Sequence, residues 1–314
     1  MKDKFNREIN YLRMSITDRC DLRCVYCMPK EGITLKKHQD ILSEDEMVNA
    51  AKIAAELGIN KIRITGGEPL VKKNIISLCK RISNIDGVDD LAITTNAVRL
   101  KEMARDLQEA GINRLNISLD TLNKEKYKYI TRVGNLDNAI DGIKEALRLK
   151  FKKIKINVVL IKGFNDDEIE NFANLTKEYP IDVRFIELMP MIDGELKNSY
   201  ISNSIVLDKL QDLEELSIEG VSKMYKLPNS LGRIGLISPI SNAFCASCNR
   251  IRLTADGKIK PCLHSNVEYS IKGLNYEDAK KVFIEATKAK PEGHGDLGVN
   301  SMSKAGRAMN EIGG

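Results

Sequence analysis

Short apolar stretches alternate with longer amphipathic stretches along the first 190 residues of the chain. The apolar stretches are rich in β-branched residues, which favours strands of a buried sheet. The amphipathic stretches predict helices, and the first helix begins at Ser43, where Glu46 completes a capping-box pattern. The predicted strands cover residues 11–16, 61–65, 91–95, 114–119, 153–160 and 183–188, and the later helices cover about 74–84, 100–110, 137–149 and 166–178.

The order of these elements predicts an α/β fold. Six strand–helix units in series form a parallel sheet with right-handed crossovers, and a full barrel would need two more units. We therefore predict a partial (βα)6 barrel of the TIM type over residues 1–190 and a C-terminal region over residues 191–314. In the C-terminal region the sequence predicts a hairpin that turns at Asp256-Gly257 and a helix over 276–289.

Residues capable of chemistry follow the predicted strands. In a barrel of this type the active site lies at the C-terminal ends of the strands. Cys20 follows the first strand, and the stretches "TGGEP" (65–69), "TTN" (94–96), "SLD" (118–120) and "ELMP" (187–190) follow the second, third, fourth and sixth strands. The sequence therefore predicts a single site that draws on five of the six strands.

The overall composition is that of a globular protein, with 42% apolar residues in 314. No stretch approaches the ~18 apolar residues of a membrane span, and the N-terminus is polar, so we expect a cytoplasmic protein without a membrane anchor. The net charge of +5 is mild, there is no Trp, and the basic residues are spread along the chain. This pattern argues against nucleic-acid binding but suits a small anionic substrate.

The seven cysteines fall into two triplets and one lone residue. Disulfides are rare in the cytosol, so we expect thiols that bind metal or pack in the core. Cys79 lies on an apolar helical face, where we predict a packed core thiol. The triplets are Cys20, Cys24 and Cys27 near the N-terminus and Cys245, Cys248 and Cys262 near the C-terminus.

The two triplets permit different metal sites. A structural zinc site is closed by four ligands, whereas the first triplet has three thiols and only His38 as a weak fourth candidate. A [4Fe–4S] cluster fits this triplet better, because three thiolates leave one iron open for a substrate or cofactor. On spacing alone, the second triplet fits either such a cluster or a Cys3His zinc site completed by His264.

The first triplet, with Tyr26 before its last cysteine, is similar to the Cys-x3-Cys-x-aromatic-Cys motif of the radical S-adenosylmethionine (SAM) superfamily. Over its whole length the chain resembles the molybdenum-cofactor biosynthesis protein A family, the GTP 3′,8-cyclases. The resemblance rests on "TDRC.LRC.YCMP", "KIRITGGEPL", "TTN", "RLNISLD", "RFIELM", "FC..CNRIRLT.DG....CL" and the terminal Gly-Gly. It implies that each triplet holds a [4Fe–4S] cluster and that the open iron of the first cluster binds SAM.

The same resemblance implies roles for further residues. The SAM site would be lined by Tyr26, Gly67, Ser118 and Met189. GTP would be bound by Arg13, Arg63, Thr94, Lys155, Arg250, Ile251 and Arg252, with its guanine at the open iron of the second cluster. The catalytic residues would be Arg307, which would orient the reduced intermediate, and the terminal Gly313 and Gly314, which would reach into the active site.

The implied reaction is the rearrangement of GTP to (8S)-3′,8-cyclo-7,8-dihydroguanosine 5′-triphosphate in molybdenum cofactor biosynthesis. A 5′-deoxyadenosyl radical from SAM removes the ribose C3′ hydrogen, and the resulting carbon radical closes a ring at guanine C8. The implied partners are GTP, a reducing electron donor and a downstream cyclic pyranopterin monophosphate synthase, and a homodimer is the candidate assembly. Two other functions stay open here: a radical SAM peptide maturase with an auxiliary cluster, and a zinc-ribbon protein that binds nucleic acid.

Overall fold

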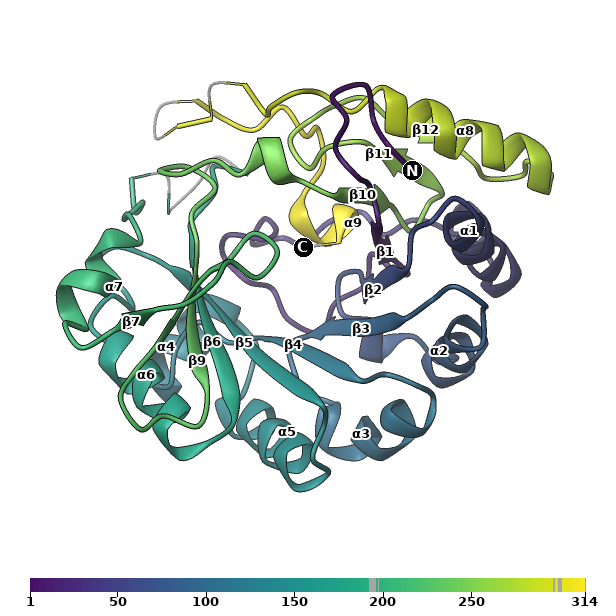
Figure 1. Cartoon of the computed structure of the whole chain (residues 1–314). Coiled ribbons are helices and arrows are strands. Elements are labelled where there is room, and N and C mark those ends of the chain that lie inside the picture. Colours follow the sequence, from purple (N-terminus) through teal and green to yellow (C-terminus); the bar gives the residue numbers. More distant parts are fainter. Residues whose placement is uncertain (192–195, 197, 296, 299–300, 314) are drawn as a thin grey trace.

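Six parallel strands in chain order form the centre of the fold (Figure 1). The computed structural model describes residues 1–314 except 192–195, 197, 296, 299–300 and 314. The six strands are β1 (Tyr11–Ser15), β2 (Lys61–Thr65), β3 (Asp90–Thr95), β4 (Arg114–Ser118), β5 (Lys153–Leu160) and β6 (Ile181–Glu187). The six predicted strands are confirmed, with ends that differ by at most two residues.

Helices cover the outer face of this sheet (Figure 1). α1 (Glu44–Glu56) begins with the predicted capping box, in which Ser43 Oγ accepts a hydrogen bond from the Glu46 N–H at 3.2 Å. Within the described residues, no helix is long and apolar enough to cross a membrane. The helices after α1 are α2 (Ile75–Ser83), α3 (Leu100–Glu109), α4 (Lys124–Thr131), α5 (Leu136–Arg148) and α6 (Ile169–Glu178), of which α4 was not predicted from the sequence.

The C-terminal region extends the sheet at both edges. β10 (Arg250–Leu253) pairs in parallel with β1, and β9 (Arg233–Ile237) pairs in parallel with β6. The strand order in the described residues is β12-β11-β10-β1-β2-β3-β4-β5-β6-β9-β8-β7, which has two free ends, so the predicted partial barrel is confirmed. The predicted hairpin joins β10 to β11. The other elements are α7 (Ser204–Lys209), β7 (Glu214–Glu215), β8 (Lys223–Lys226), β11 (Lys258–Lys260), β12 (Tyr269–Ser270), α8 (Tyr276–Lys288), α9 (Met309–Ile312) and the 3-10 turns η1 (His38–Asp40), η2 (Pro69–Val71) and η3 (Cys245–Ser247).

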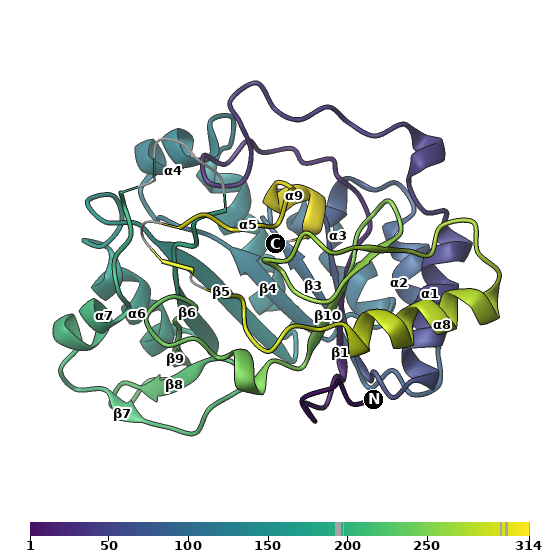
Figure 2. The same cartoon turned by 90° about the horizontal axis from the view of Figure 1, so that it is seen from above.

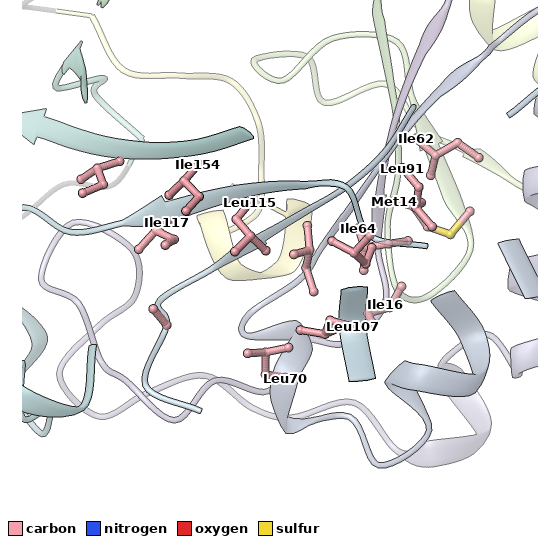
Figure 3. Close-up of a cluster of buried hydrophobic side chains, with 14 of the residues drawn as sticks. Met14, Ile16, Ile62, Ile64, Leu70, Leu91, Leu107, Leu115, Ile117 and Ile154 are labelled. Atoms are coloured by element: carbon pink, nitrogen blue, oxygen red, sulfur yellow. The ribbon is translucent and has the colours of Figure 1, made fainter. Parts of the chain in front are cut away.

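The central strands separate an apolar outer face from a polar inner face. Figure 3 shows Met14, Ile62 and Ile64 among the buried side chains of the core. The neighbouring positions Arg13 and Arg63 line the inside of the barrel, because successive side chains of a strand point to opposite faces. Burial of the apolar residues against the helices therefore fixes which polar residues point inward.

Candidate active site

One cavity inside the barrel brings the two cysteine triplets together. Its volume is about 310 Å³, and all six cysteines of the triplets line it. Nine further residues that were predicted for the site also line it, namely Arg13, Tyr26, Arg63, Gly67, Thr94, Ser118, Met189, Arg250 and Arg252. Four predicted residues lie outside this lining, namely Lys155, Ile251, Arg307 and Gly313, and Gly314 lies outside the described residues.

The loop that carries the first triplet is held against the end of α4. The Arg23 N–H donates to the Thr131 carbonyl oxygen at 3.0 Å, and the Val25 N–H donates to the Ile130 carbonyl oxygen at 2.9 Å. The guanidinium of Arg23 also donates to the Cys20 carbonyl oxygen at 2.7 Å. The backbone around the thiols is therefore positioned by a helix rather than left as a free loop.

The "GGEP" loop packs directly against the residues that precede Cys20. The Gly67 N–H donates to the Thr17 carbonyl oxygen and the Glu68 N–H donates to the Arg19 carbonyl oxygen, both at 2.8 Å. A β-carbon at Gly67 would overlap the Arg19 carbonyl group, so the close approach requires glycine. This loop, which the resemblance connects with SAM, is thus fixed beside the first triplet.

The cysteines of the first triplet are half-buried, and their thiols interact electrostatically with one another. Burial raises the pKa of Cys20 and of Cys27 to about 12, and it raises the pKa of Cys24 well above its ordinary value. Such thiols lose their protons when a metal binds them. Among the described residues, no group of three His, Cys, Asp or Glu side chains is close enough to hold a single metal ion. Three thiols at one cavity leave the fourth position open, which suits an iron–sulfur cluster with an open iron better than a closed zinc site.

The second triplet comes from two segments that the β10–β11 hairpin brings together. Cys245 begins η3, Cys248 lies just before β10, and Cys262 follows β11. Arg7, from the N-terminal segment, donates to the Cys245 carbonyl oxygen at 2.9 Å. His264 lines the same cavity, but the described residues form no single-ion site with it. Three thiols at one cavity are a donor set that also suits a cluster.

The strand register places arginines side by side inside the barrel. Arg13 of β1 lies between Arg252 of β10 and Arg63 of β2. Burial lowers the pKa of Arg63 and of Arg252 to about 10, and burial together with the charges of its two neighbours lowers the pKa of Arg13. The Nε atoms of Arg63 and Arg250 and the Oγ1 atom of Thr94 are buried without a hydrogen-bond partner in the described part of the chain. Crowded cations with unused donors fit a highly charged anion such as a triphosphate.

Lys155 lies outside the cavity lining and contacts the carboxylate of Glu219. Its ammonium group donates to Glu219 Oε1 at 2.7 Å, and its side chain is 2% exposed. Lys153, Arg184 and Arg233 contact the same carboxylate at 2.7, 3.1 and 2.7 Å. Burial lowers the pKa of Lys155 to about 7. The predicted contact of Lys155 with GTP stays a prediction, because its ammonium group faces Glu219 in this structure.

The C-terminal segment enters the barrel. α9 lies in the middle of the ring of strands in Figure 1 and above the strands in Figure 2. Met309 lines the cavity, and the Gly313 carbonyl oxygen accepts a hydrogen bond from Arg252 Nη1 at 2.7 Å. A β-carbon at Gly313 would overlap the Thr65 hydroxyl group. The tail therefore contacts residues of the candidate site, although Gly313 itself does not line the cavity.

Arg307 connects this tail to the β10–β11 hairpin. Its guanidinium group pairs with Asp256 at 3.1 Å and with Glu268 at 2.6 Å. Its side chain is 13% exposed, so the two ion pairs are largely shielded from solvent. The predicted contact of Arg307 with a reaction intermediate stays a prediction, because both carboxylates already hold the side chain outside the cavity lining.

Several residues of the cavity were not predicted from the sequence. Asn116 lies two residues before Ser118 on β4, and strand alternation could have revealed it because alternate residues share a face. Lys290 and His294 follow α8, in a segment where no pattern indicated a role. Asn157 and Arg184 are further polar residues of the lining that were not predicted, whereas Glu68, Asn96 and Asp120 belong to the predicted stretches and His264 to the alternative zinc site.

Comparisons with known protein families agree with this geometry. Residues 14–176 match the radical SAM superfamily, and residues 181–296 match the family described as Molybdenum Cofactor Synthesis C. A GTP 3′,8-cyclase of Alkaliphilus metalliredigens is 51% identical over 321 aligned positions that cover 100% of both chains. A GTP 3′,8-cyclase of Peptoclostridium acidaminophilum is 50% identical and covers 93% of this chain and 92% of its own.

Solved structures of low sequence identity share the fold. Streptococcus suis SuiB bound to S-adenosylmethionine superposes with a TM-score of 0.61 at 18% identity, covering 88% of this chain and 65% of SuiB. The structure of anSMEcpe with bound AdoMet has a TM-score of 0.61 at 15% identity, covering 88% of this chain and 78% of its own. At these identities the likeness concerns the arrangement of the barrel alone.

Proposed function

Because the chain belongs to the GTP 3′,8-cyclase family of radical SAM enzymes, we propose that its two triplets hold two [4Fe–4S] clusters that flank one substrate. Its activity is that of a radical SAM lyase in molybdenum cofactor biosynthesis, with GTP as substrate and (8S)-3′,8-cyclo-7,8-dihydroguanosine 5′-triphosphate as product. The observation that carries the two-cluster proposal is the single cavity lined by both triplets. The peptide-maturase alternative is not favoured, because relatives that share half of the residues are GTP 3′,8-cyclases.

The first triplet and its surroundings serve the SAM end of the cavity. Cys20, Cys24 and Cys27 hold the first cluster, and Tyr26, Gly67, Ser118 and Met189 contact SAM. The packing of Gly67 against the segment before Cys20 supports this assignment, because it fixes the loop next to the thiols. When bound, the cluster and SAM supply the 5′-deoxyadenosyl radical that removes the ribose C3′ hydrogen of GTP.

The second triplet and the arginines serve the GTP end. Cys245, Cys248 and Cys262 hold the second cluster next to the guanine, and Arg13, Arg63, Thr94, Arg250 and Arg252 bind GTP, with Lys155 and the Ile251 backbone as further contacts. The adjacent guanidinium groups on β10, β1 and β2 support the phosphate assignment, because they repel each other unless an anion lies between them. Buried cations of this kind hold the triphosphate in one orientation and so present the ribose to the radical source.

The C-terminal tail contributes to the GTP end of the cavity. The family to which the chain belongs implies an electron donor and a downstream enzyme as further partners. Gly313 and Gly314 reach the bound nucleotide, and Arg307 positions this tail. A reducing electron donor feeds the first cluster, and a cyclic pyranopterin monophosphate synthase consumes the product. The proposed location is the cytoplasm, and a homodimer is the candidate assembly.

The test is an anaerobic assay with reconstituted, reduced protein and SAM. We expect about four irons for each occupied triplet and release of 5′-deoxyadenosine that GTP stimulates strongly and ATP does not. Cys24→Ala protein serves as the control, and it should lose SAM cleavage because the first cluster cannot form. Cleavage that ignores the nucleotide would leave a radical SAM enzyme with another substrate. Protein that holds zinc and no iron would overturn the proposal.

A further inference from the structure

Lys290 places a buried ammonium group beside the second triplet. The residue follows α8 and is 3% exposed, and it lines the same cavity as the cysteines. Its Nζ atom donates to the Arg250 carbonyl oxygen at 2.8 Å and to the Pro261 carbonyl oxygen at 2.8 Å. Arg250 lies two residues after Cys248 and Pro261 lies directly before Cys262. One side chain therefore ties together the two chain segments that carry these thiols.

Lys290 and the Cys248 thiol line the same cavity, and the charge of the ammonium group acts on that thiol. An ammonium group has three donors, and the two carbonyl groups use two of them. In the described residues, Lys290 forms no ion pair with a carboxylate. A buried cation without a counter-ion is costly, and the thiolate site in the same cavity can supply that anion.

A second buried lysine of the same region does have a carboxylate partner. Lys260, on β11, is 0% exposed and also donates to carbonyl oxygens, those of Ser265 and Ala305. It pairs with the carboxylate of Glu268 at 2.9 Å, so its charge is balanced without the thiols. The two lysines share burial and backbone partners, and they differ in the anion that each one faces.

We propose that Lys290 is the counter-ion of the second cluster and a positioning residue for the thiols of Cys248 and Cys262. This role rests on the proposed function, in which the second triplet holds a [4Fe–4S] cluster. A cluster held by three thiolates gains one negative charge when it accepts an electron. A fixed cation beside the ligand sulfurs stabilises that reduced form, so Lys290 raises the reduction potential of the second cluster.

The test isolates the second cluster in the full chain. Replacing Cys20, Cys24 and Cys27 by Ala removes the first site and gives the parent protein for the comparison. Lys290→Met is then introduced into this parent, because Met keeps the length of the side chain and removes its charge. Lys290→Arg is the conservative variant, and Lys260→Met is the matched control. The readouts are iron per chain, the rate of iron release to a chelator, and the midpoint potential from a dithionite titration followed by electron paramagnetic resonance.

We expect the parent to hold about four irons, and Lys290→Met to shift the midpoint potential to a more negative value and to release iron faster. Lys290→Arg should restore most of the shift, and Lys260→Met should leave the potential at the parent value. If Lys290→Met fails to assemble a cluster, Lys290→Gln supplies the comparison, because its amide keeps two donors without the charge.

The outcomes separate this inference from the proposed function. A parent protein that holds four irons, with the same potential and iron-release rate in Lys290→Met, would overturn the role of Lys290 and leave the two-cluster assignment intact. A shift of equal size in Lys260→Met would also overturn it, because any buried lysine of this region would then have the same effect. A parent protein that holds no iron would overturn the two-cluster assignment and the role of Lys290 together.

Discussion

Glu68, in the "GGEP" loop, is a buried carboxyl group that titrates near neutral pH. It is 1% exposed, and burial raises its pKa to about 7 from an ordinary value of 4.5. Its oxygens accept hydrogen bonds from the Thr95 hydroxyl and the Asn96 N–H, both at 2.7 Å, which offset the effect of burial only in part. In the cluster-free protein, ionisation of Glu68 therefore opposes folding.

We predict that Glu68→Gln reduces the pH dependence of stability of the cluster-free protein. The folded-state pKa lies above the unfolded one, so the stability contributed by Glu68 is complete below pH 4.5 and is lost as the pH rises through 7. The shift corresponds to a contribution of Glu68 to the free energy of unfolding that is roughly 3 kcal/mol smaller at pH 8 than at pH 4. Urea unfolding of both proteins at several pH values measures the difference.

Glu56→Gln is the control for this comparison. Glu56 lies on the exposed side of α1, where it contacts Lys280 and Tyr276, and its burial is too small to give a comparable effect. The pH dependence of this variant should match that of the wild type. Asp120, whose pKa burial raises to about 6, leaves a smaller dependence of the same sign in every variant. Equal pH profiles for the wild type and Glu68→Gln would contradict the prediction.

The residues of the site could be predicted where a local motif carries them. The thiol triplets and the "GGEP" loop are compact in sequence, and Cys79 is 0% exposed as its helical face predicts. Lys155 is different, since its observed partner Glu219 lies 64 residues away and no local pattern links the two. Lys290 was missed for the same reason, because its partners belong to another segment of the chain.

At the scale of elements, a glycine sets the distance between two helices. Gly142 lies within α5, and a β-carbon there would overlap the carbonyl group of Ala97 and crowd Leu100, at the start of α3. Alanine favours a helix over glycine by about 1 kcal/mol, but overpacking against a backbone group costs ~1–3 kcal/mol. The steric effect should therefore prevail at this position.

We predict that Gly142→Ala lowers the free energy of unfolding by about 2 kcal/mol. The measurement is urea unfolding of the cluster-free protein. Asp141→Ala on the same helix is the control, because its ion pair with Lys101 is exposed and such pairs contribute ~0–1 kcal/mol. A Gly142→Ala protein that is as stable as the wild type would show that α5 and α3 can separate without cost.

Arg307 provides the second prediction at this scale. Its ion pairs with Asp256 and Glu268 fasten the chain before α9 to the turn of the β10–β11 hairpin and to the segment before β12. Breaking a buried pair of this kind costs ~3–5 kcal/mol, reduced here because Lys36 and Lys260 still face the two carboxylates. We predict that Arg307→Met keeps both clusters and raises amide hydrogen exchange in α9 at least roughly tenfold, which corresponds to ~1.4 kcal/mol.

Hydrogen exchange detected by mass spectrometry measures this opening. Arg81→Met is the control, because Arg81 also pairs with two carboxylates, those of Glu44 and Asp45, on the exposed surface. Exchange in α9 should not change in that variant. Slow exchange in α9 of Arg307→Met would mean that packing inside the barrel, and not the ion pairs, holds the tail.

The elements of the first 190 residues were predictable because each strand and helix has its own periodicity. The strands that pair with the two edges of this sheet were not predictable in the same way. β10 pairs with β1, and β9 pairs with β6, across long separations in sequence, and their partners depend on burial across the assembled sheet rather than on local pattern. The sequence therefore predicted the hairpin of β10 and β11 but not its position next to the first strand.

At the scale of the whole molecule, the two ends of the chain meet at the site. The N-terminal segment reaches the second triplet through Arg7, which donates to the Cys245 carbonyl oxygen. The C-terminal tail reaches the first triplet, since the Asn310 side chain donates to the Asp18 carbonyl oxygen at 3.1 Å. Each triplet is thus supported by the end of the chain that is remote from it in sequence. Cluster assembly should consequently depend on both ends of the chain.

The tail gives the last prediction, because glycine at position 313 meets two demands at once. Its φ of +80° lies in the left-handed region, and a β-carbon would overlap the Thr65 hydroxyl group and crowd Ser15. Gly306 has a similar φ of +66°, and a β-carbon there would meet nothing within 4 Å, so Gly306→Ala controls for backbone strain alone.

We predict that Gly313→Ala and Gly306→Ala both retain iron. We also predict that the yield of cyclised product falls at least roughly tenfold further in Gly313→Ala than in Gly306→Ala, because displacing the tail needs to raise the activation free energy by only about 1.4 kcal/mol for that factor. Product analysis by mass spectrometry after anaerobic turnover measures the yields. Equal yields would mean that the contact of Gly313 with β1 and β2 has no part in catalysis, and that the tail acts through the Arg252 hydrogen bond or not at all.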